Sequence, residues 1–383
     1  MVDFTLTPRD QYLVDIARED ALIARQYARY YDLRENELEP EQLPGMQDRP
    51  DPFALLKADH SGTSGPVLTE ALLFLEHAEV RARRSRSGLG DKIVNYAGTP
   101  EQVARWGKKL LSIAMTEPGA GSDPSMIRGT ARKDPATGEW ILNGEKIYCS
   151  AFGAADGAVA LLRGAPDEKG VRPFEAFVVE KGTPGLTELG QVHKMGIRSW
   201  DTADFVMQDC RVPAINRLDV DFKKFMFVFN GTRPMIAAFG LKFARNLLDM
   251  TKEKLVEAGT PLTYDKGRST RSAIEDRLIS LEALLEAATL TVLHCKWAEQ
   301  IGGTTTGATM VEAAMAKAHG GKAARRVTQE CLEMLGPQAL TEEFLAEKWF
   351  RDARIMDIFE GAGEVNRLII ARSILGYSNK ELN

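Results

Sequence analysis

The spacing of apolar residues divides the chain into a helical first third, a strand-rich middle and a helical remainder. Over residues 9–31, apolar positions recur every three or four residues without Gly or Pro, which predicts an amphipathic helix. The same period returns over 67–84, after a Pro- and acid-rich connector at 35–52. Thr99 followed by Pro100 is typical of a helix start, with Thr99 as the N-cap. The first third is therefore expected to be helical.

Short, glycine-punctuated segments with alternating polarity begin at about residue 112. They include Trp140–Leu142, which precedes the turn pair Asn143-Gly144, and Phe174–Glu180. Segments of this length and spacing predict an antiparallel β region of about a hundred residues.

The helical period resumes after about residue 220 and continues to the end of the chain. Residues 281–295 and 310–331 predict two long helices, and long helices joined by short loops indicate an antiparallel bundle. Because strands and helices do not alternate along the chain, the order of segments excludes a doubly wound parallel sheet.

Length and charge restrict the class of protein further. The 383 residues allow two or three domains, and Lys and Arg (49) do not outnumber Asp and Glu (54), so the net charge is -5. Without a basic surplus, nucleic acid is not an expected partner. The apolar runs are short and the first ten residues are polar, so we expect a soluble, cytoplasmic protein with no membrane span.

The metal-binding and nucleotide-binding motifs that sequence alone can indicate are missing. The four cysteines and five histidines lie far apart, so no metal site is expected and the cysteines are interpreted as buried thiols in a reducing compartment. The segment Gly119-Ala120-Gly121 lacks the third glycine of a dinucleotide-binding turn. Neither a Walker loop nor a G-x-S-x-G elbow is present.

Two segments remain as candidates for chemistry. In Thr116–Asp123, glycines allow close approach to a flat or anionic ligand, while Thr116 and Ser122 offer hydroxyl groups; a tight interdomain turn explains the composition equally well. Glu360 follows an apolar run and precedes a glycine, so an apolar surrounding would raise its pKa and make it a base. On composition alone, a carboxylate that favours the start of the last helix is the better explanation.

Taken together with motifs elsewhere, these segments resemble the acyl-CoA dehydrogenase flavoprotein family. The family's T-E-P-G-A-G-S-D stands unbroken at 116–123. It is accompanied, in the family's order and spacing over about residues 65–375, by N-G-E-K at 143–146, M-G-I-R at 195–198, T-R-P at 232–234, and R-D-A-R at 351–354 before Glu360-Gly361. The resemblance implies an α+β fold with an N-terminal helical domain (1–111), a central antiparallel β-barrel-like domain (112–217) and a C-terminal four-helix bundle (218–383).

The resemblance also implies a reaction. FAD would bind between the β domain and the bundle, with an acyl-CoA thioester against it. Glu360 would remove the α-proton while the β-hydride passes to the flavin, leaving a trans-2-enoyl-CoA. An electron-transfer flavoprotein would accept the electrons, and the protein would form a homotetramer.

The positions that match the family's contacts are specific. Those that match cofactor contacts are Met115, Thr116, Gly121, Ser122, Tyr148, Cys149, Ser150, Gly336, Ala362 and Glu364. Those that match substrate contacts are Ser122, Asn230, Thr232, Arg233 and Gly361, with Arg233 expected near Glu360. Tyr148 and Ser150 stand where the family usually has Trp and Thr, so an aromatic face and a hydroxyl are retained.

Three departures concern the adenine half of FAD. The family's R-x-x-F-G is absent near 255–262, which leaves Lys266 and Arg268 as possible substitutes. The usual Q-x-x-G-G becomes 333–337 with Glu333 at its start, and the Thr after the E-G pair becomes Ala362. A carboxylate near a pyrophosphate would weaken binding, so we expect weak retention of FAD.

Alternatives remain open at the level of sequence. The same fold could serve as a flavin-dependent oxidase or monooxygenase, or the chain could be a subunit of a heteromeric acyl-CoA dehydrogenase. The acyl chain length is not determined. Phe152 and Trp200 could reshape the acyl site, although packing in the core is the simpler interpretation of both.

Overall fold

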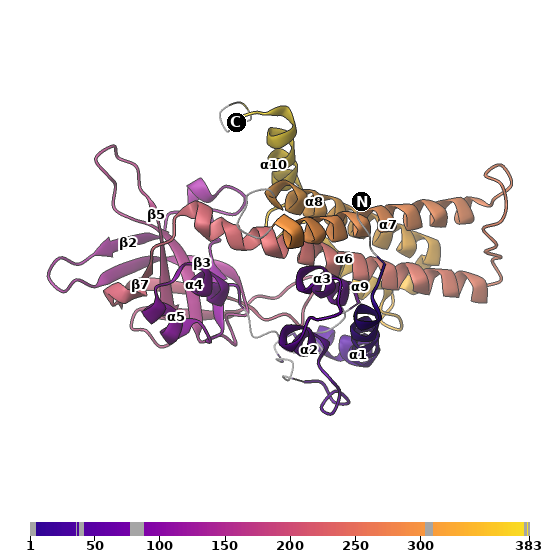
Figure 1. The fold of residues 1–383 in the computed structure, drawn as a ribbon, viewed down its shortest axis with the longest axis horizontal. Coiled ribbons are helices and arrows are strands. Elements are labelled where there is room, and N and C mark those ends of the chain that lie inside the picture. Colours follow the sequence, from indigo (N-terminus) through magenta and orange to yellow (C-terminus); the bar gives the residue numbers. More distant parts are fainter. Residues whose placement is uncertain are drawn as a thin grey trace.

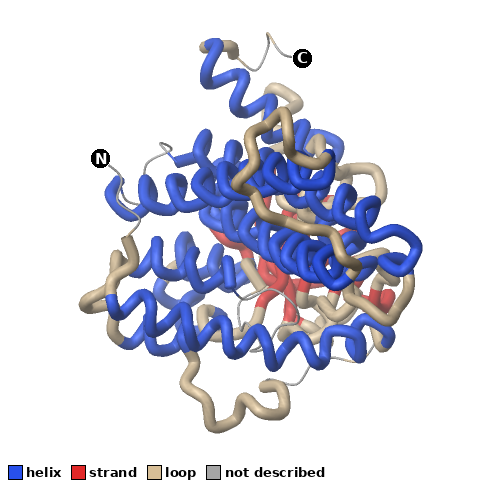
Figure 2. The backbone as a smooth tube through the Cα atoms, turned by 90° about the vertical axis from the view of Figure 1, so that its right-hand side faces the viewer, coloured by secondary structure: helices blue, strands red, loops and turns tan. Residues whose placement is uncertain are grey.

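The computed structural model describes residues 5–35, 37, 42–76, 88–302, 309–378 and 381. Figure 1 shows the strands gathered at one end of the molecule and long helices extending from them to the other. Viewed along the long axis, the strands lie behind the helices (Figure 2). This mixed architecture confirms the α+β class.

The first third is helical, as predicted, and its helices lie in two places. The bounds are α1 Pro8–Leu33, α2 Pro52–Ala58, α3 Pro66–Glu76, α4 Gly90–Ala97 and α5 Pro100–Trp106. Helices α1–α3 lie beside the long C-terminal helices, whereas α4 and α5 lie beside the sheet (Figure 1). Residues 77–84 of the helix predicted over 67–84 lie outside the described residues.

The predicted helix start at Thr99 is confirmed in detail. The Thr99 hydroxyl accepts a hydrogen bond from the Gln102 backbone N–H, and the Gln102 side chain accepts one from the Thr99 N–H, which forms a capping box. The Gln102 amide also donates to the Ile215 and Arg217 carbonyls, so this cap ties α5 to the end of the β region.

The middle of the chain forms one sheet. Its strands are β1 Leu111–Ala114, β2 Thr130–Lys133, β3 Trp140–Ser150, β4 Gly157–Arg163, β5 Phe174–Glu180, β6 Leu186–Gln191, β7 Thr202–Val212 and β8 Arg217–Leu218. The order is β6-β7-β3-β2-β4-β5-β8, and β1 pairs with β4.

Most strand pairs are antiparallel, as predicted, but two pairings that involve β4 are parallel. Strand β1 runs parallel to β4, and β2 touches β4 in parallel at one residue pair. Parallel neighbours need a long crossover, and the segment 115–156, which contains the β2–β3 hairpin, supplies it. A crossover of this kind cannot be read from strand spacing alone.

The remaining helices form a bundle. Their bounds are α6 Phe222–Glu257, α7 Ala273–Gly302, α8 Met310–Leu335, α9 Ala346–Ile355 and α10 Gly363–Leu375. Both long helices predicted over 281–295 and 310–331 are confirmed. Among the described helices, α7 is the one long and apolar enough to cross a membrane by length and composition. It packs against α3, α6 and α8 as part of the bundle.

Helix α6 connects the two halves of the molecule. Near its start, Phe225, Val228 and Phe229 pack in the same cluster as residues of β4 and β5. Further along, Leu241 and Leu248 belong to the core of the bundle. The segment between these contacts, 230–233, therefore lies where the sheet and the bundle meet.

The side chains that could have shaped either the acyl site or the core are packed in the core. Phe152 is fully buried and stacks on Phe205, and Trp200 packs edge-on against Phe239. All four cysteines are free and buried, as predicted.

Candidate active site

A buried ion pair shapes the loop Thr116–Asp123, which follows β1. The Glu117 carboxylate accepts hydrogen bonds from the backbone N–H groups of Arg128 (2.7 Å) and Gly129 (3.0 Å) and from Lys146 Nζ (2.8 Å). The fully buried Lys146 also donates to the carbonyls of Met115 (3.0 Å) and Leu161 (2.6 Å). Burial lowers the pKa of Lys146, and Glu117 opposes that shift.

The outer face of this loop lies beside an exposed aromatic ring. The backbone N–H of Ile147 donates to the Thr116 carbonyl at 3.0 Å, which joins the loop to β3. The next residue, Tyr148, is 60% exposed and has a positive φ of 57°, and its N–H donates to Asp204 Oδ1 at 2.7 Å. A Cβ added at Gly121 would meet no heavy atom within 4 Å, so the backbone there is open to a ligand.

The predicted cofactor positions on β3 differ in what they can offer. Tyr148 presents its ring, and Ser150 is partly exposed. The Cys149 side chain is buried in the sheet core, and burial raises its pKa to about 12. Only the backbone of Cys149 is therefore available to a cofactor.

Glu360 lies between α9 and α10 and is held from α6. Thr232 Oγ1 donates to Glu360 Oε2 at 2.7 Å, and Arg233 Nε donates to the Glu360 carbonyl at 3.1 Å. Arg233 Nη1 also donates to Asn230 Oδ1 at 3.3 Å. The structure thus brings together Asn230, Thr232, Arg233 and Glu360, including the expected proximity of Arg233.

Two consecutive left-handed residues define the turn at Glu360. The φ of Glu360 is 57° and that of Gly361 is 94°, and a Cβ at Gly361 would lie 3.2 Å from Asn366 Nδ2. Asn366, buried in α10, donates to the carbonyls of Gly361 (2.7 Å) and Ala362 (3.2 Å). Within the described ranges, the backbone N–H of Glu360 donates to no acceptor in the chain. That N–H is available to an oxygen of a ligand.

Burial raises the pKa of Glu360, and this is the largest influence on the group. The hydrogen bond from Thr232 and the positive charges of Lys317, Arg233 and Lys92 act in the opposite direction. A carboxylate with a raised pKa is a stronger proton acceptor than an exposed one once it is ionised.

The two candidate segments are linked through α6. Met115 and Ala120 pack in the same cluster as Val228 and Phe229, which lie about one helical turn before Thr232. The loop and the Glu360 turn therefore face the same stretch of α6.

Two further predicted cofactor positions, Gly336 and Glu364, are not among the residues that hold Glu360. Gly336 caps the C-terminus of α8, roughly 28 Å from the level of Lys317 at 1.5 Å per residue, and so lies away from Glu360 in this chain. Glu364 is exposed in the first turn of α10, where it forms an ion pair with Arg367 at 3.0 Å.

The structure shows where the residues lie that depart from the family's motifs for the adenine half of FAD. Lys266 and Arg268 lie on the exposed loop between α6 and α7. Glu333 forms an ion pair with Arg277, which also contacts Glu330 at 2.8 Å. Arg277 thus offsets the carboxylate that was expected to repel a pyrophosphate.

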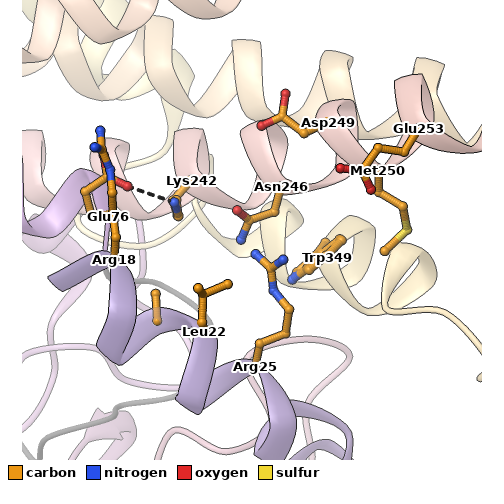
Figure 3. A pocket seen from close by; sticks show the side chains of 11 residues that line it. Arg18, Leu22, Arg25, Glu76, Lys242, Asn246, Asp249, Met250, Glu253 and Trp349 are labelled. Carbon is orange, nitrogen blue, oxygen red and sulfur yellow. Dashed lines mark hydrogen bonds and ion pairs between the residues drawn. The ribbon is translucent and has the colours of Figure 1, made fainter. Parts of the chain in front are cut away.

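A cavity of about 390 Å³ lies away from these residues, between α1, α6 and α9 (Figure 3). Among the residues that line it, the Arg25 guanidinium lies over the ring of Trp349. The Glu76 carboxylate forms ion pairs with Arg18 and Lys242. None of the predicted site residues lines it.

Lys317 contacts the candidate site but is not among the positions predicted from the sequence. It lies fully buried on α8, and its Nζ is 3.4 Å from the Gly361 carbonyl oxygen. In the sequence, Lys317 is a single lysine on the alanine-rich face of a predicted helix, between Ala313 and Gly320. A lysine on such a buried face is unusual and could have indicated a specific role.

The chain matches two family models and is similar to known proteins over most of its length. The acyl-CoA dehydrogenase middle-domain model matches residues 112–210, and the C-terminal-domain model matches residues 222–375. The chain is 31% identical over 335 residues to an acyl-CoA dehydrogenase of Bacillus subtilis (strain 168), covering 83% of this chain and 85% of that protein. It is 29% identical to the acryloyl-CoA reductase (NADH) of Anaerotignum propionicum, covering 98% and 96% of the two chains.

The structure of butyryl-CoA dehydrogenase from Megasphaera elsdenii is also similar. Its TM-score is 0.79 at 28% identity, covering 98% of this chain and 100% of that one. The family models and these relatives thus indicate an oxidoreductase that acts on acyl-CoA thioesters. The chain belongs to the acyl-CoA dehydrogenase family.

Proposed function

We propose that the protein catalyses FAD-dependent α,β-dehydrogenation of an acyl-CoA to the trans-2-enoyl-CoA, with Glu360 as the base that removes the α-proton. The observation that carries this proposal is the partly buried Glu360 carboxylate, which Thr232 holds at 2.7 Å. The test is anaerobic reduction of bound flavin by a panel of acyl-CoAs, in the wild type and in Glu360→Gln.

The residues around Glu360 have different roles in the proposed reaction. Thr232 orients the carboxylate, and Arg233 fixes the backbone of the turn through the Glu360 carbonyl. The Glu360 N–H donates to the thioester oxygen, which stabilises negative charge as the α-proton leaves. Gly361 allows the chain to adopt this turn because its φ is positive.

The loop and β3 would hold the cofactor. We assign the flavin ring to the face formed by Met115, Thr116 and Tyr148, and assign Ser122 to both cofactor and CoA. The exposed Tyr148 ring and the open backbone at Gly121 support this assignment. Bound FAD supplies the acceptor for the β-hydride. We also assign Ser150, the backbone of Cys149, and Ala362 to contacts with the cofactor. Gly336 and Glu364 are assigned to parts of the cofactor that lie farther from Glu360.

The rate of flavin reduction is expected to rise with pH through a midpoint above 4.5. Burial raises the pKa of Glu360 from that value, and only the ionised carboxylate can accept a proton, so activity is lost as pH falls through the raised pKa. Stopped-flow measurement of flavin reduction against pH tests this. A rate that stays constant down to pH 4.5 contradicts the assignment of Glu360 as base.

We expect FAD to dissociate from the purified protein during dialysis in high salt. The family's R-x-x-F-G is absent, and the residues that could replace it, Lys266 and Arg268, lie on an exposed loop. Screening by salt weakens exposed charge contacts to phosphate. The flavin content before and after dialysis is the measurement, and stoichiometric FAD after dialysis would show that another contact holds the pyrophosphate.

The wider biological setting is also proposed. We propose domains at 1–111, 112–217 and 218–383, an electron-transfer flavoprotein as electron acceptor, a homotetrameric assembly and a cytoplasmic location. The family-model boundaries at 112–210 and 222–375 support the division. Peroxide formation under air separates a dehydrogenase from an oxidase, and co-purification with a related chain would favour a heteromeric enzyme.

A further inference from the structure

Helix α8 places one buried cation beneath the Glu360 turn. Lys317 has no exposed surface, and its neighbours on the buried face, Ala313, Ala316 and Gly320, are small. A Cβ at Gly321 would lie 3.0 Å from the backbone of Asp357, so α8 approaches the segment that leads to Glu360 very closely. Burying an ammonium group is costly without a partner, which suggests a specific task for this lysine.

Three helices hold the carbonyls of this turn. Arg233 of α6 donates to the Glu360 carbonyl, and Asn366 of α10 donates to the Gly361 carbonyl at 2.7 Å. Lys317 of α8 donates to the same Gly361 oxygen at 3.4 Å. A positive φ at a non-glycine residue such as Glu360 is unfavourable and persists only where the surroundings enforce it.

We infer that Lys317 is a positioning residue for the reaction: its ammonium group holds the Glu360-Gly361 turn in place and stabilises the ionised form of the Glu360 carboxylate. This inference rests on the proposed role of Glu360 as the base. Lys317 acts through Glu360 and the turn, without touching the substrate.

The charges that act on these two groups come from five parts of the chain. Those that act on Glu360 are Lys317 from α8, Arg233 from α6 and Lys92 from α4. Those that act on Lys317 are Asp357 and Glu360 before α10, Arg233 from α6 and Glu364 from α10. Burial lowers the pKa of Lys317 to about 8, and the carboxylates oppose that shift, so the group is a cation below that pH. Removing this cation therefore favours the protonated form of Glu360.

The experiment is an infrared titration of the Glu360 carboxyl group in the FAD-loaded protein without substrate. The Glu360 band is identified by its absence in Glu360→Gln. The titration is repeated in Lys317→Met, Lys317→Gln and Lys317→Arg, with Lys322→Met, an exposed lysine on the same helix, as the matched control. Lys317→Gln keeps a donor for the Gly361 carbonyl, so it separates charge from hydrogen bonding and serves if the methionine variant does not fold.

We expect the midpoint of Glu360 to rise by about one pH unit in both neutral variants, because an opposite charge close by typically shifts a pKa by that amount or more. In Lys317→Arg and Lys322→Met the midpoint should stay near that of the wild type. An unchanged midpoint in Lys317→Met and Lys317→Gln, or an equal shift in Lys322→Met, overturns the inference. The titration needs no turnover, so failure of the inference about Lys317 is distinguishable from failure of the proposed function. The latter would appear as no flavin reduction by any acyl-CoA in the wild type.

Discussion

Glu360→Gln is expected to lower the rate of flavin reduction by an acyl-CoA at least about 1,000-fold, within the range by which a positioned general base accelerates proton transfer. The amide retains the size of the side chain and an oxygen for the Thr232 hydroxyl, but it cannot accept the α-proton. Substrate and FAD binding should therefore change little, while the chemical step is lost. Stopped-flow absorbance of the flavin after anaerobic mixing measures this step directly.

Glu286→Gln is the matched control for this substitution. Glu286 is an exposed glutamate on α7, so its loss of charge should leave the rate within about twofold of the wild type. If Glu360→Gln reduced its flavin as fast as Glu286→Gln, Glu360 would not be the base.

Lys146→Met is expected to destabilise the protein by about 3 kcal/mol or more, because it leaves the buried Glu117 carboxylate without its cation. Lys146 also satisfies the carbonyls of Met115 and Leu161, and these bonds would be lost at the same time. The loop Thr116–Asp123 depends on this pair, so FAD binding should weaken together with stability. The free energy of unfolding from urea titration and the flavin content are the two measurements.

Lys133→Met provides the comparison, since Lys133 is an exposed residue of β2 and its substitution should cost less than about 0.5 kcal/mol. In the double variant Glu117→Gln/Lys146→Met, the buried charge is removed together with its partner. That protein should be more stable than Lys146→Met alone. Equal stability of Lys146→Met and Lys133→Met would mean that the buried pair does not shape the loop.

The sequence predicted the helices well because their signals are local. The Thr99 cap and the long helices α7 and α8 follow from spacing and capping chemistry over a few turns. The parallel pairing of β1 with β4 was missed because it depends on the crossover over 115–156, which no local pattern encodes. For the same reason, spacing alone could not show that α4 and α5 lie beside the sheet.

In the site too, motifs within one segment could be predicted from the sequence, whereas contacts between distant segments could not. The role of Glu360 is predicted only through the resemblance to the family, which also predicts that Arg233 lies near Glu360 and assigns Thr232 to a substrate contact. The contact of Lys317 with the Gly361 carbonyl joins residues 44 positions apart, and it was visible only once α8 was packed against the turn. The pairing of Glu333 with Arg277 likewise joins α8 to α7, so the sequence alone could not reveal it.

The proposed reaction removes two hydrogens from an acyl-CoA. The most direct measurement is the absorbance of protein-bound FAD after anaerobic addition of a panel of straight-chain, branched and cyclic acyl-CoAs. We predict that at least one of them bleaches the flavin of the wild type stoichiometrically and yields the 2-enoyl-CoA, and that the same compound leaves the flavin of Glu360→Gln oxidised over the same period. Flavin that remains oxidised with every member of the panel in the wild type would contradict the claim.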